Sequence, residues 1–263
     1  MARRRSGGIT IKSRRDLNMM IEAGQIVAHA KANMAAAAAP GIETRELDAI
    51  AENTIRKLGA VPSFKGYNPG MSMRYAFPAT ICASLNDEIV HGIPSRRKLK
   101  EGDILSVDCG AFYGGVHGDS AFSIGIGKIS EDRQRLMDAT KESLDRGIAK
   151  VRAGARIGDI SNAIQRYAEG LGYYLVKQYV GHGIGYDMHE EPQVPNYGKA
   201  GNGPLIRKGM GLAIEPMLNI GTAETKVLED GWTVSTADGS LSAHFEDTVI
   251  VTDRGPVITT RLA

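Results

Sequence analysis

The chain has 263 residues, 24% of them charged, and a formal net charge of +2 at pH 7. This length can bury a sizeable core, and the near-neutral charge argues against nucleic acid as a main partner. Two cysteines are too few for a disulfide framework and lack zinc-finger spacing. No apolar run approaches membrane-spanning length. We expect a monomeric, cytoplasmic protein with neither a membrane nor DNA as a partner.

The first residues, MARRRSGG, are strongly basic, and Lys12, Arg14 and Arg15 extend the run. No apolar segment follows them, so a secretory signal is not expected. We expect residues 1–12 to form a basic, disordered arm. Such an arm can make a transient contact with an anionic surface such as ribosomal RNA.

Two helices are predicted next. The first begins at a capping-box pattern between Ser13 and Asp16 and ends at Pro40, and the second runs from about Thr44 to Gly59. An irregular stretch rich in Gly, Pro and aromatic residues follows. The segment ICASLNDEIVHGIP is then strand-like, with a turn at its Asn-Asp pair.

A β-hairpin is predicted over residues 103–126, DILSVDCGAFYGGVHGDSAFSIGI. With its Gly-Gly pair as a two-residue loop, Gly110 lies opposite Asp119, and Asp108 shares the sheet face of Asp119. Two carboxylates on one face of a mostly apolar hairpin stay ionised only if a cation joins them. The hairpin therefore predicts part of a metal site.

After Gly127 the pattern begins again, with a helix capped by Ser130, a second helix closed by Gly172, and strand-like YYLVKQYV before GHGIG. GMGLAIEPML and a final hairpin ending in HFEDTVIVTD complete the second half. Four sequence matches recur in the same order, which indicates an internal duplication. The halves span about residues 13–127 and 128–260.

The duplication pairs chemically similar residues: His91 with His182, Asp108 with Glu215, and Asp119 with Glu246. Halves packed about a pseudo-two-fold axis would bring these side chains together. The four carboxylates and one of the two imidazoles make the candidate metal centre: Asp108, Asp119, His182, Glu215 and Glu246.

The four carboxylates of this centre carry a formal charge of −4, which two divalent cations neutralise. Oxygen-rich ligation with one imidazole suits Mn, Fe, Co, Zn or Mg ions and not a thiolate-type structural site. Two such ions roughly 3.5–4 Å apart can activate water and polarise a carbonyl group. The pattern predicts metal-assisted hydrolysis.

The segments NDEIVHGIP, SVDCG, HGDSAF, GHGIG, AIEPML and AHFEDTVIVT resemble the motif set of the type I methionine aminopeptidases in type and order. The resemblance runs from about Ser13 to Thr259. It implies an α+β, pita-bread fold with two pseudo-two-fold related α/β halves and a central curved antiparallel sheet, in one catalytic domain over residues 13–263. It also implies removal of the initiator methionine from nascent proteins with a small second residue, so that the partners are N-terminal Met peptides and nascent chains.

The same resemblance implies a role for each site residue. The metal ligands would be Asp119 and Glu246 as bridges, Asp108 on one ion, and His182 with Glu215 on the other. His91 and His189 would contact the substrate and stabilise the tetrahedral intermediate, as the catalytic histidines. The residues that match the methionine pocket are Tyr67, Phe77, Cys82 and Trp232.

Two departures leave the shape of the pocket open. Phe64 and Met188 stand where bacterial relatives commonly have a cysteine and an aromatic residue, and the segment 66–77 is longer than in compact bacterial forms. The hairpin register places His117 on the carboxylate face, but the family has no ligand there, so we expect a packing role. Cys109 faces the other way in that register and is expected in the core.

Two other hypotheses about the function remain open. Prolidases and aminopeptidase P share the fold, but they usually carry a separate N-terminal domain, and few residues precede the first helix here. A non-catalytic peptide-binding relative, or a metal-independent one like the creatinases, typically lacks some of the ligands that this chain retains. Release of methionine from Met-Ala-Ser, tested beside an Xaa-Pro peptide, separates these possibilities.

Overall fold

The computed structural model describes residues 8–68 and 75–262. The elements of the first half are α1 (Arg14–Ala37), α2 (Thr44–Lys57), β1 (Val61–Pro62), β2 (Ile81–Leu85), β3 (Glu88–Val90), β4 (Ile104–Tyr113) and β5 (Val116–Gly125). Those of the second half are α3 (Glu131–Ile148), α4 (Ile157–Gly170), β6 (Tyr174–Leu175), β7 (Gly181–Gly183), β8 (Glu190–Val194), β9 (Gly211–Ile214), β10 (Met217–Asn219), β11 (Thr225–Val227), β12 (Val234–Thr236), β13 (Ser242–His244), β14 (Asp247–Thr252) and β15 (Gly255–Ile258).

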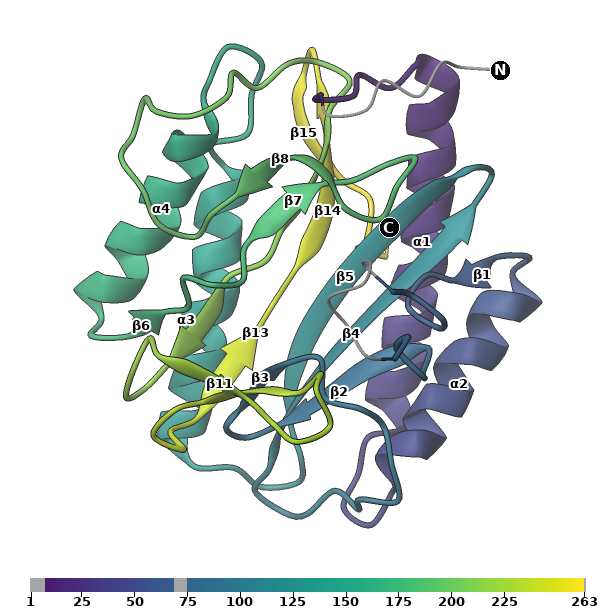
Figure 1. Ribbon diagram of the computed structural model, residues 1–263, viewed down its shortest axis with the longest axis vertical. Coiled ribbons are helices and arrows are strands. Elements are labelled where there is room, and N and C mark those ends of the chain that lie inside the picture. The colour runs from purple at the N-terminus through teal and green to yellow at the C-terminus, as the bar shows by residue number, and fades with distance from the viewer. Residues whose placement is uncertain (1–7, 69–74, 263) are drawn as a thin grey trace.

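The two helix pairs lie on opposite sides of the molecule, with the strands between them (Figure 1). Every strand pairing within the described ranges is antiparallel. In the first half, β4 lies between β1 and β2 and also pairs with β5. In the second half, the largest sheet has the order β15-β14-β9-β7-β8. None of the helices in the described ranges is both long and apolar enough to cross a membrane.

The β4–β5 hairpin has the predicted register. Tyr113 pairs with Val116, and Gly110 pairs with Asp119. Both turn glycines have positive φ, 60° and 91°, as a two-residue hairpin loop requires. The prediction is confirmed because the turn chemistry alone fixes which residues oppose one another.

The first helix begins as its capping box predicts. The Ser13 side chain accepts a hydrogen bond from the backbone of Asp16, and the Asp16 side chain accepts one from the backbone of Ser13. These two bonds satisfy backbone donors that a helix start otherwise leaves unpaired. The helix ends at Ala37, before Pro40, which cannot continue it.

The helices α2 and α4, which the repeated sequence motifs match to each other, are alike in length and in their endings. Each has 14 residues and ends before a glycine of positive φ, Gly59 at 81° and Gly172 at 84°. A glycine there accommodates the left-handed conformation that terminates a helix. The residue preceding each helix also forms an isolated β-bridge at an equivalent place: Glu43 with Lys98, and Arg156 with Leu205.

The final hairpin of the second half differs from the prediction. The segment HFEDTVIVTD, expected as the last strand of that hairpin, is divided between two strands: His244 ends β13, which pairs with β10, whereas β14 pairs with β9 and β15. Between them the backbone N–H of Phe245 bonds to Pro216, and that of Glu246 bonds to Ala121 in β5. The strand is interrupted between His244 and Asp247, because the backbone N–H of Glu246 is bonded to the other half of the molecule. The strand-like YYLVKQYV is likewise shorter than predicted, since only β6 forms there.

The last residues of the predicted arm, 8–12, are not a disordered tail. Residues 1–7 lie outside the described residues, but residues 8–12 lie along the domain. The backbone N–H of Lys12 bonds to Gly209, and its ammonium group pairs with Glu190 at 2.6 Å. The side chains of this pair are only 1% and 5% exposed. The expected boundary at residue 12 is therefore wrong, because a buried ion pair anchors the end of the basic run.

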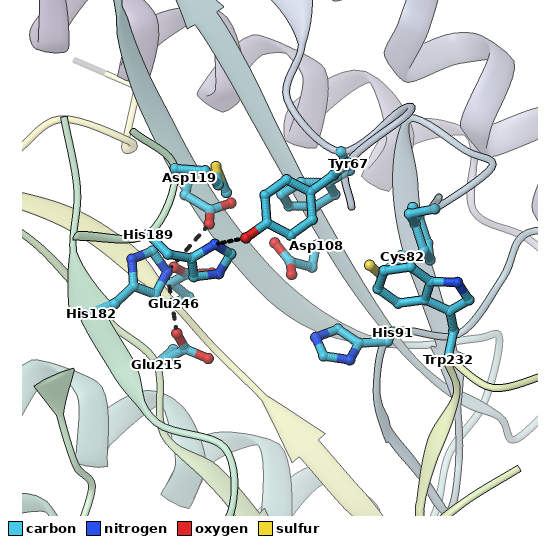
Figure 2. A pocket seen from close by; sticks show the side chains of 13 residues that line it. Tyr67, Cys82, His91, Asp108, Asp119, His182, His189, Glu215, Trp232 and Glu246 are labelled. Carbon is cyan, nitrogen blue, oxygen red and sulfur yellow. Dashed lines mark hydrogen bonds and ion pairs between the residues drawn. The ribbon is translucent and has the colours of Figure 1, made fainter. Parts of the chain in front are cut away.

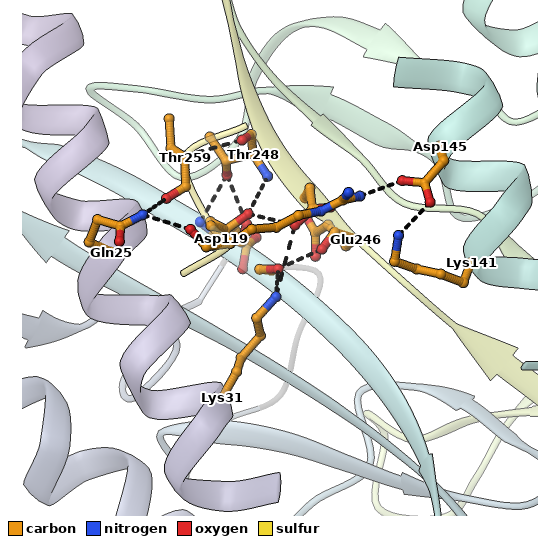
Figure 3. A network of polar contacts seen from close by, with 12 residues as sticks. Gln25, Lys31, Asp119, Lys141, Asp145, Glu246, Thr248 and Thr259 are labelled. Atoms are coloured by element: carbon orange, nitrogen blue, oxygen red, sulfur yellow. Dashed lines mark hydrogen bonds and ion pairs between the residues drawn. The ribbon is translucent and has the colours of Figure 1, made fainter. Parts of the chain in front are cut away.

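Residues 259–261 pack against α1. A Cβ atom added to Gly24 would lie 2.5 Å from the backbone oxygen of Thr259, so only glycine allows this approach. The side-chain amide of the adjacent Gln25 donates to the carbonyl groups of Thr259 and Arg261, at 2.9 Å each (Figure 3). Residues 259–261 are thus fixed against the first helix.

Candidate active site

A single cavity of about 430 Å³ contains every predicted site residue (Figure 2). One side is polar and the other is aromatic and sulfur-containing. The polar residues are His91, Asp108, Asp119, His182, His189, Glu215 and Glu246. The apolar and sulfur-containing ones are Phe64, Tyr67, Phe77, Cys82, Met188 and Trp232.

The carboxylates come from both halves of the molecule. Asp108 and Asp119 are carried by the β4–β5 hairpin, on the face predicted from its register. Glu215 directly follows β9, and Glu246 directly precedes β14. Because Asp247 pairs with Ile214, the antiparallel ladder places these two glutamates next to each other.

Three of these residues form a tight group. One ligand atom each of Asp119, His182 and Glu246 lies within 4.8 Å of the others. The Nε2 atom of His182 is 3.9 Å from Oδ2 of Asp119 and 3.7 Å from Oε1 of Glu215. Its other nitrogen, Nδ1, lies 2.9 Å from the carbonyl oxygen of Gly183 and donates to it. This bond leaves the lone pair of Nε2 directed at the carboxylates, as in a histidine that binds a metal.

Burial raises the pKa of all four carboxyl groups above their ordinary values, and neighbouring carboxylates raise those of Asp119, Glu215 and Glu246 further. Three of their oxygen atoms, Oδ1 of Asp108, Oδ1 of Asp119 and Oε1 of Glu246, are buried and have no hydrogen-bond partner. Buried polar atoms of this kind need a partner. Unpaired carboxylate oxygens beside a neutral imidazole fit hard or borderline divalent cations.

His91 lies in a different environment from His182. Its backbone has a φ of 61°, unusual for a residue other than glycine. Its ring contacts those of Tyr179 and Trp232, with centroid distances of 5.6 and 6.3 Å. Burial, and then the neighbouring His189, lowers the pKa of His91 to about 4. The ring is therefore neutral and keeps one N–H for a hydrogen bond.

His189 is held from two sides. The Tyr67 hydroxyl lies 2.7 Å from its Nδ1, and the rings of His189 and His182 are 4.3 Å apart. The next residue, Glu190, accepts hydrogen bonds from the backbone N–H groups of Tyr186 and Asp187 and pairs with the buried Lys12. The loop that carries His189 is therefore braced by the N-terminal segment.

The apolar wall suits an unbranched side chain. The Phe77 and Trp232 rings pack edge to face, 5.2 Å apart, and Met188 belongs to the same buried cluster. Burial, followed by the nearby Asp108, raises the pKa of the Cys82 thiol well above its ordinary value, so the sulfur is uncharged. Sulfur and aromatic groups make favourable contacts with a thioether.

His117 and Cys109 are placed as predicted. The Nδ1 atom of His117 lies 2.9 Å from the Ser63 hydroxyl, its ring packs 4.7 Å from Phe112, and it does not line the cavity. Cys109 is fully buried in the core of the first half.

Hydroxyl groups join the two halves directly behind the carboxylates (Figure 3), and the prediction from sequence missed them. The Thr248 hydroxyl accepts from the backbone N–H of Asp119 at 3.0 Å and donates to its carbonyl oxygen at 2.8 Å. The Ser120 hydroxyl donates to the Glu246 carbonyl and accepts from Lys31, both at 2.5 Å. Serine and threonine are common in strands, so nothing in the sequence distinguished these.

The prediction also missed His244. It is 2% exposed, and its Nε2 atom is 3.8 Å from Oε2 of Glu215. The sequence did contain a signal. His244 and Glu246 are two residues apart in AHFED, a spacing that places side chains on one face of a strand.

Known proteins resemble this chain over nearly its whole length. The model of metallopeptidase family M24 matches residues 18–253. The chain is 50% identical to a methionine aminopeptidase of Clostridium acetobutylicum, over 96% of this chain and 98% of that one. It is 49% identical to methionine aminopeptidase 1 of Bacillus subtilis, over 97% and 100%.

Solved structures agree. A methionine aminopeptidase of Thermotoga maritima superposes with a TM-score of 0.93 and 41% identity, over 97% of this chain and 100% of that one. A prolidase of Pyrococcus furiosus, 20% identical, has a TM-score of 0.77 over 96% of this chain and 66% of its own, and shares the fold alone. The expected pita-bread fold is confirmed. The chain belongs to metallopeptidase family M24.

Proposed function

We propose that this chain is a metal-dependent methionine aminopeptidase that removes the initiator methionine from nascent proteins with a small second residue. One observation carries the proposal. A single cavity joins buried carboxylates that lack hydrogen-bond partners to a wall of sulfur and aromatic side chains. The first feature suits metal-assisted hydrolysis, and the second suits the side chain of methionine. The similarity to methionine aminopeptidases over almost the full chain supports it.

Two divalent ions would be held by the predicted ligands. Asp119 and Glu246, at the junction of the halves, would hold the ions together with Asp108 of the first half and with His182 and Glu215 of the second. When bound, such ions supply Lewis acidity, which polarises a peptide carbonyl and acidifies water.

The remaining polar residues would act on the substrate. His91 and His189 are uncharged and line the cavity beside the carboxylates. Each can donate a ring N–H to the peptide oxygen as negative charge develops on it. Tyr67 holds the His189 ring in place, and the wall that contains Trp232 orients the methionine side chain.

Three peptides and the purified protein test the proposal. After addition of Mn²⁺ or Co²⁺, we expect free methionine from Met-Ala-Ser, little from Met-Leu-Ser, and no cleavage of Ala-Pro-Ala. Glu246→Ala serves as the inactive control, because it lacks a central carboxylate. Cleavage of Ala-Pro-Ala alone would make the chain an Xaa-Pro peptidase. Cleavage of none of the three, with metal bound, would make it a peptide-binding relative.

We also propose that residues 13–263 act as one catalytic domain built from halves of about 13–127 and 128–260. The matched helices and bridges of the two halves support this division. The cavity draws its residues from both halves, so neither half would be active alone. We expect this domain to act as a monomer in the cytoplasm, where nascent chains emerge.

The basic residues Arg3, Arg4 and Arg5 are our candidate for a transient contact with ribosomal RNA. Deleting residues 2–8 should leave Met-Ala-Ser cleavage unchanged and weaken co-sedimentation with ribosomes at low salt. Residues from Lys12 onward must stay, because they brace the His189 loop. If co-sedimentation is unaffected, the residues are only a solvated tail.

A further inference from the structure

His244 is a buried imidazole with an unpartnered nitrogen. Its side chain is 2% exposed, and its Nε2 atom lacks a hydrogen-bond partner among the described residues. An unpaired buried nitrogen destabilises the folded state, so its position calls for an explanation. This Nε2 atom lies 3.8 Å from Oε2 of Glu215.

Glu215 lies between two imidazoles. Its Oε1 atom faces Nε2 of His182 at 3.7 Å, and its Oε2 atom faces Nε2 of His244 at 3.8 Å. The two histidines have different surroundings, because His182 lines the cavity and His244 does not. One carboxylate oxygen is therefore presented to the cavity, and the other is presented to a side chain behind it.

The backbone of His244 is fixed by the other half of the molecule. The Ser123 hydroxyl in β5 accepts from the His244 N–H and donates to its carbonyl oxygen, at 2.9 Å each. Ser106 lies 2.7 Å from the same hydroxyl. The backbone that carries the imidazole is thus held in place by hydrogen bonds, as is required of a residue that positions another side chain.

We propose that His244 is a positioning residue for Glu215: its neutral ring donates the Nε2 proton to Oε2 and so orients Oε1 towards the metal centre. The inference rests on the metal centre proposed above. The separation of 3.8 Å between His244 Nε2 and Glu215 Oε2 exceeds hydrogen-bond length, so the proposal requires the two side chains to move closer when the metal centre is occupied. Groups that hold a ligating carboxylate typically change metal affinity by about 10–100-fold.

Metal affinity tests the proposal without reference to activity. The full-length protein, stripped of metal, is titrated with Co²⁺ by calorimetry, as wild type, His244→Gln and His244→Leu. We expect His244→Leu to bind one ion about 10–100-fold more weakly. His244→Gln should stay within about threefold of wild type, because its amide N–H reaches a position similar to that of Nε2. Thermal unfolding of the metal-free proteins shows whether each variant folds.

A second pair of variants keeps the test decisive. If His244→Leu does not fold, His244→Asn replaces it, because its amide is too short to reach Glu215. His117→Leu is the matched control, since that imidazole lies outside the cavity and bonds Ser63, and the Co²⁺ affinity of this variant should not change.

Three results overturn the inference. Wild-type Co²⁺ affinity in His244→Leu or His244→Asn would show that Glu215 needs no support. Equal weakening in His244→Gln and His244→Leu would assign the effect to ring packing and not to a donated proton. Absence of Co²⁺ binding by wild type would reject the metal centre itself, and with it the proposed function.

Discussion

The two halves of the molecule place a histidine at corresponding points and use it differently. His182 in the second half directs Nε2 at Asp119 and Glu215, at 3.9 and 3.7 Å. His91 in the first half packs against Tyr179 and Trp232, and no ion pair between it and a carboxylate occurs in the part of the chain that the structure describes.

This difference shows that the side chains around a histidine, and not its place in the sequence motif, decide its chemistry. Both rings are buried, and burial lowers both pKa values, to about 4 for His91 and about 3 for His182. Both are therefore neutral imidazoles. One has carboxylates around its free nitrogen and suits a cation, whereas the other has an aromatic wall and suits a substrate.

Removal of metal should have the largest effect on activity, because both halves contribute carboxylates to the proposed metal centre. Protein stripped with a chelator should release no methionine from Met-Ala-Ser, and adding back Co²⁺, Mn²⁺, Fe²⁺, Zn²⁺ or Mg²⁺ singly should restore activity to different extents. Three oxygen atoms of the clustered carboxyl groups are buried without a hydrogen-bond partner, which fits divalent cations that acidify water. Full turnover by protein shown to be metal-free would contradict the mechanism.

His182→Ala should come next. The change removes a nitrogen from the tight group with Asp119 and Glu246, so one ion should bind at least about 100-fold more weakly. Activity should be nearly lost at stoichiometric metal and should recover partly at high metal concentration. Calorimetric titration measures the affinity. Unchanged binding of both ions would show that the second half does not provide the metal histidine.

His91→Ala should leave the metal stoichiometry at the wild-type value. Loss of a donor to a developing oxyanion is typically worth about 10²–10³ in rate, so kcat should fall by that factor with KM nearly constant. The comparison of the halves fails if His91→Ala loses an ion and His182→Ala retains both.

Lys12→Met should have the smallest effect on catalysis. It tests a third histidine of the cavity, His189, because Lys12 pairs with the next residue, Glu190. Breaking a buried ion pair on one side costs about 3–5 kcal/mol, and the loop that carries His189 would loosen. We expect a lower Tm and a several-fold higher KM, with unchanged metal affinity. The exposed pair of Lys208 and Asp253 gives the control, because Lys208→Met should change neither quantity. An unaltered Tm in Lys12→Met would show that the brace contributes nothing.

Much of the site could be predicted because short stretches of sequence, a turn and several motifs, indicate where its residues lie. The Gly-Gly turn fixed the pairing of Gly110 with Asp119, and the repeated motifs identified His182, Glu215 and Glu246. All of them line one cavity. A period-two pattern and a turn are properties of neighbouring residues, so one sequence suffices to recognise them.

The rest depended on distant partners. Lys12 looked like part of a solvated basic arm, but its carboxylate partner stands 178 residues away. The expected final hairpin failed for a similar reason, since Glu246 leaves its strand to bond Ala121 of the other half. His244 was visible in AHFED, but only the fold shows that Glu215 faces it. Tertiary contacts of this kind override local pattern.

The contact of α1 with residues 259–261 has a consequence for the order of folding. Gln25 bonds the carbonyl of Thr259 across 234 residues, and Gly24 leaves room for that backbone and for nothing larger. Most of the packing of α1 is against α2, β4 and β5 of its own half, and residues 259–261 add a contact from the second half. Contacts this distant in sequence form late in folding, after the intervening chain is available. We therefore expect α1 to pack on its own half early in folding and to gain its contact with residues 259–261 last.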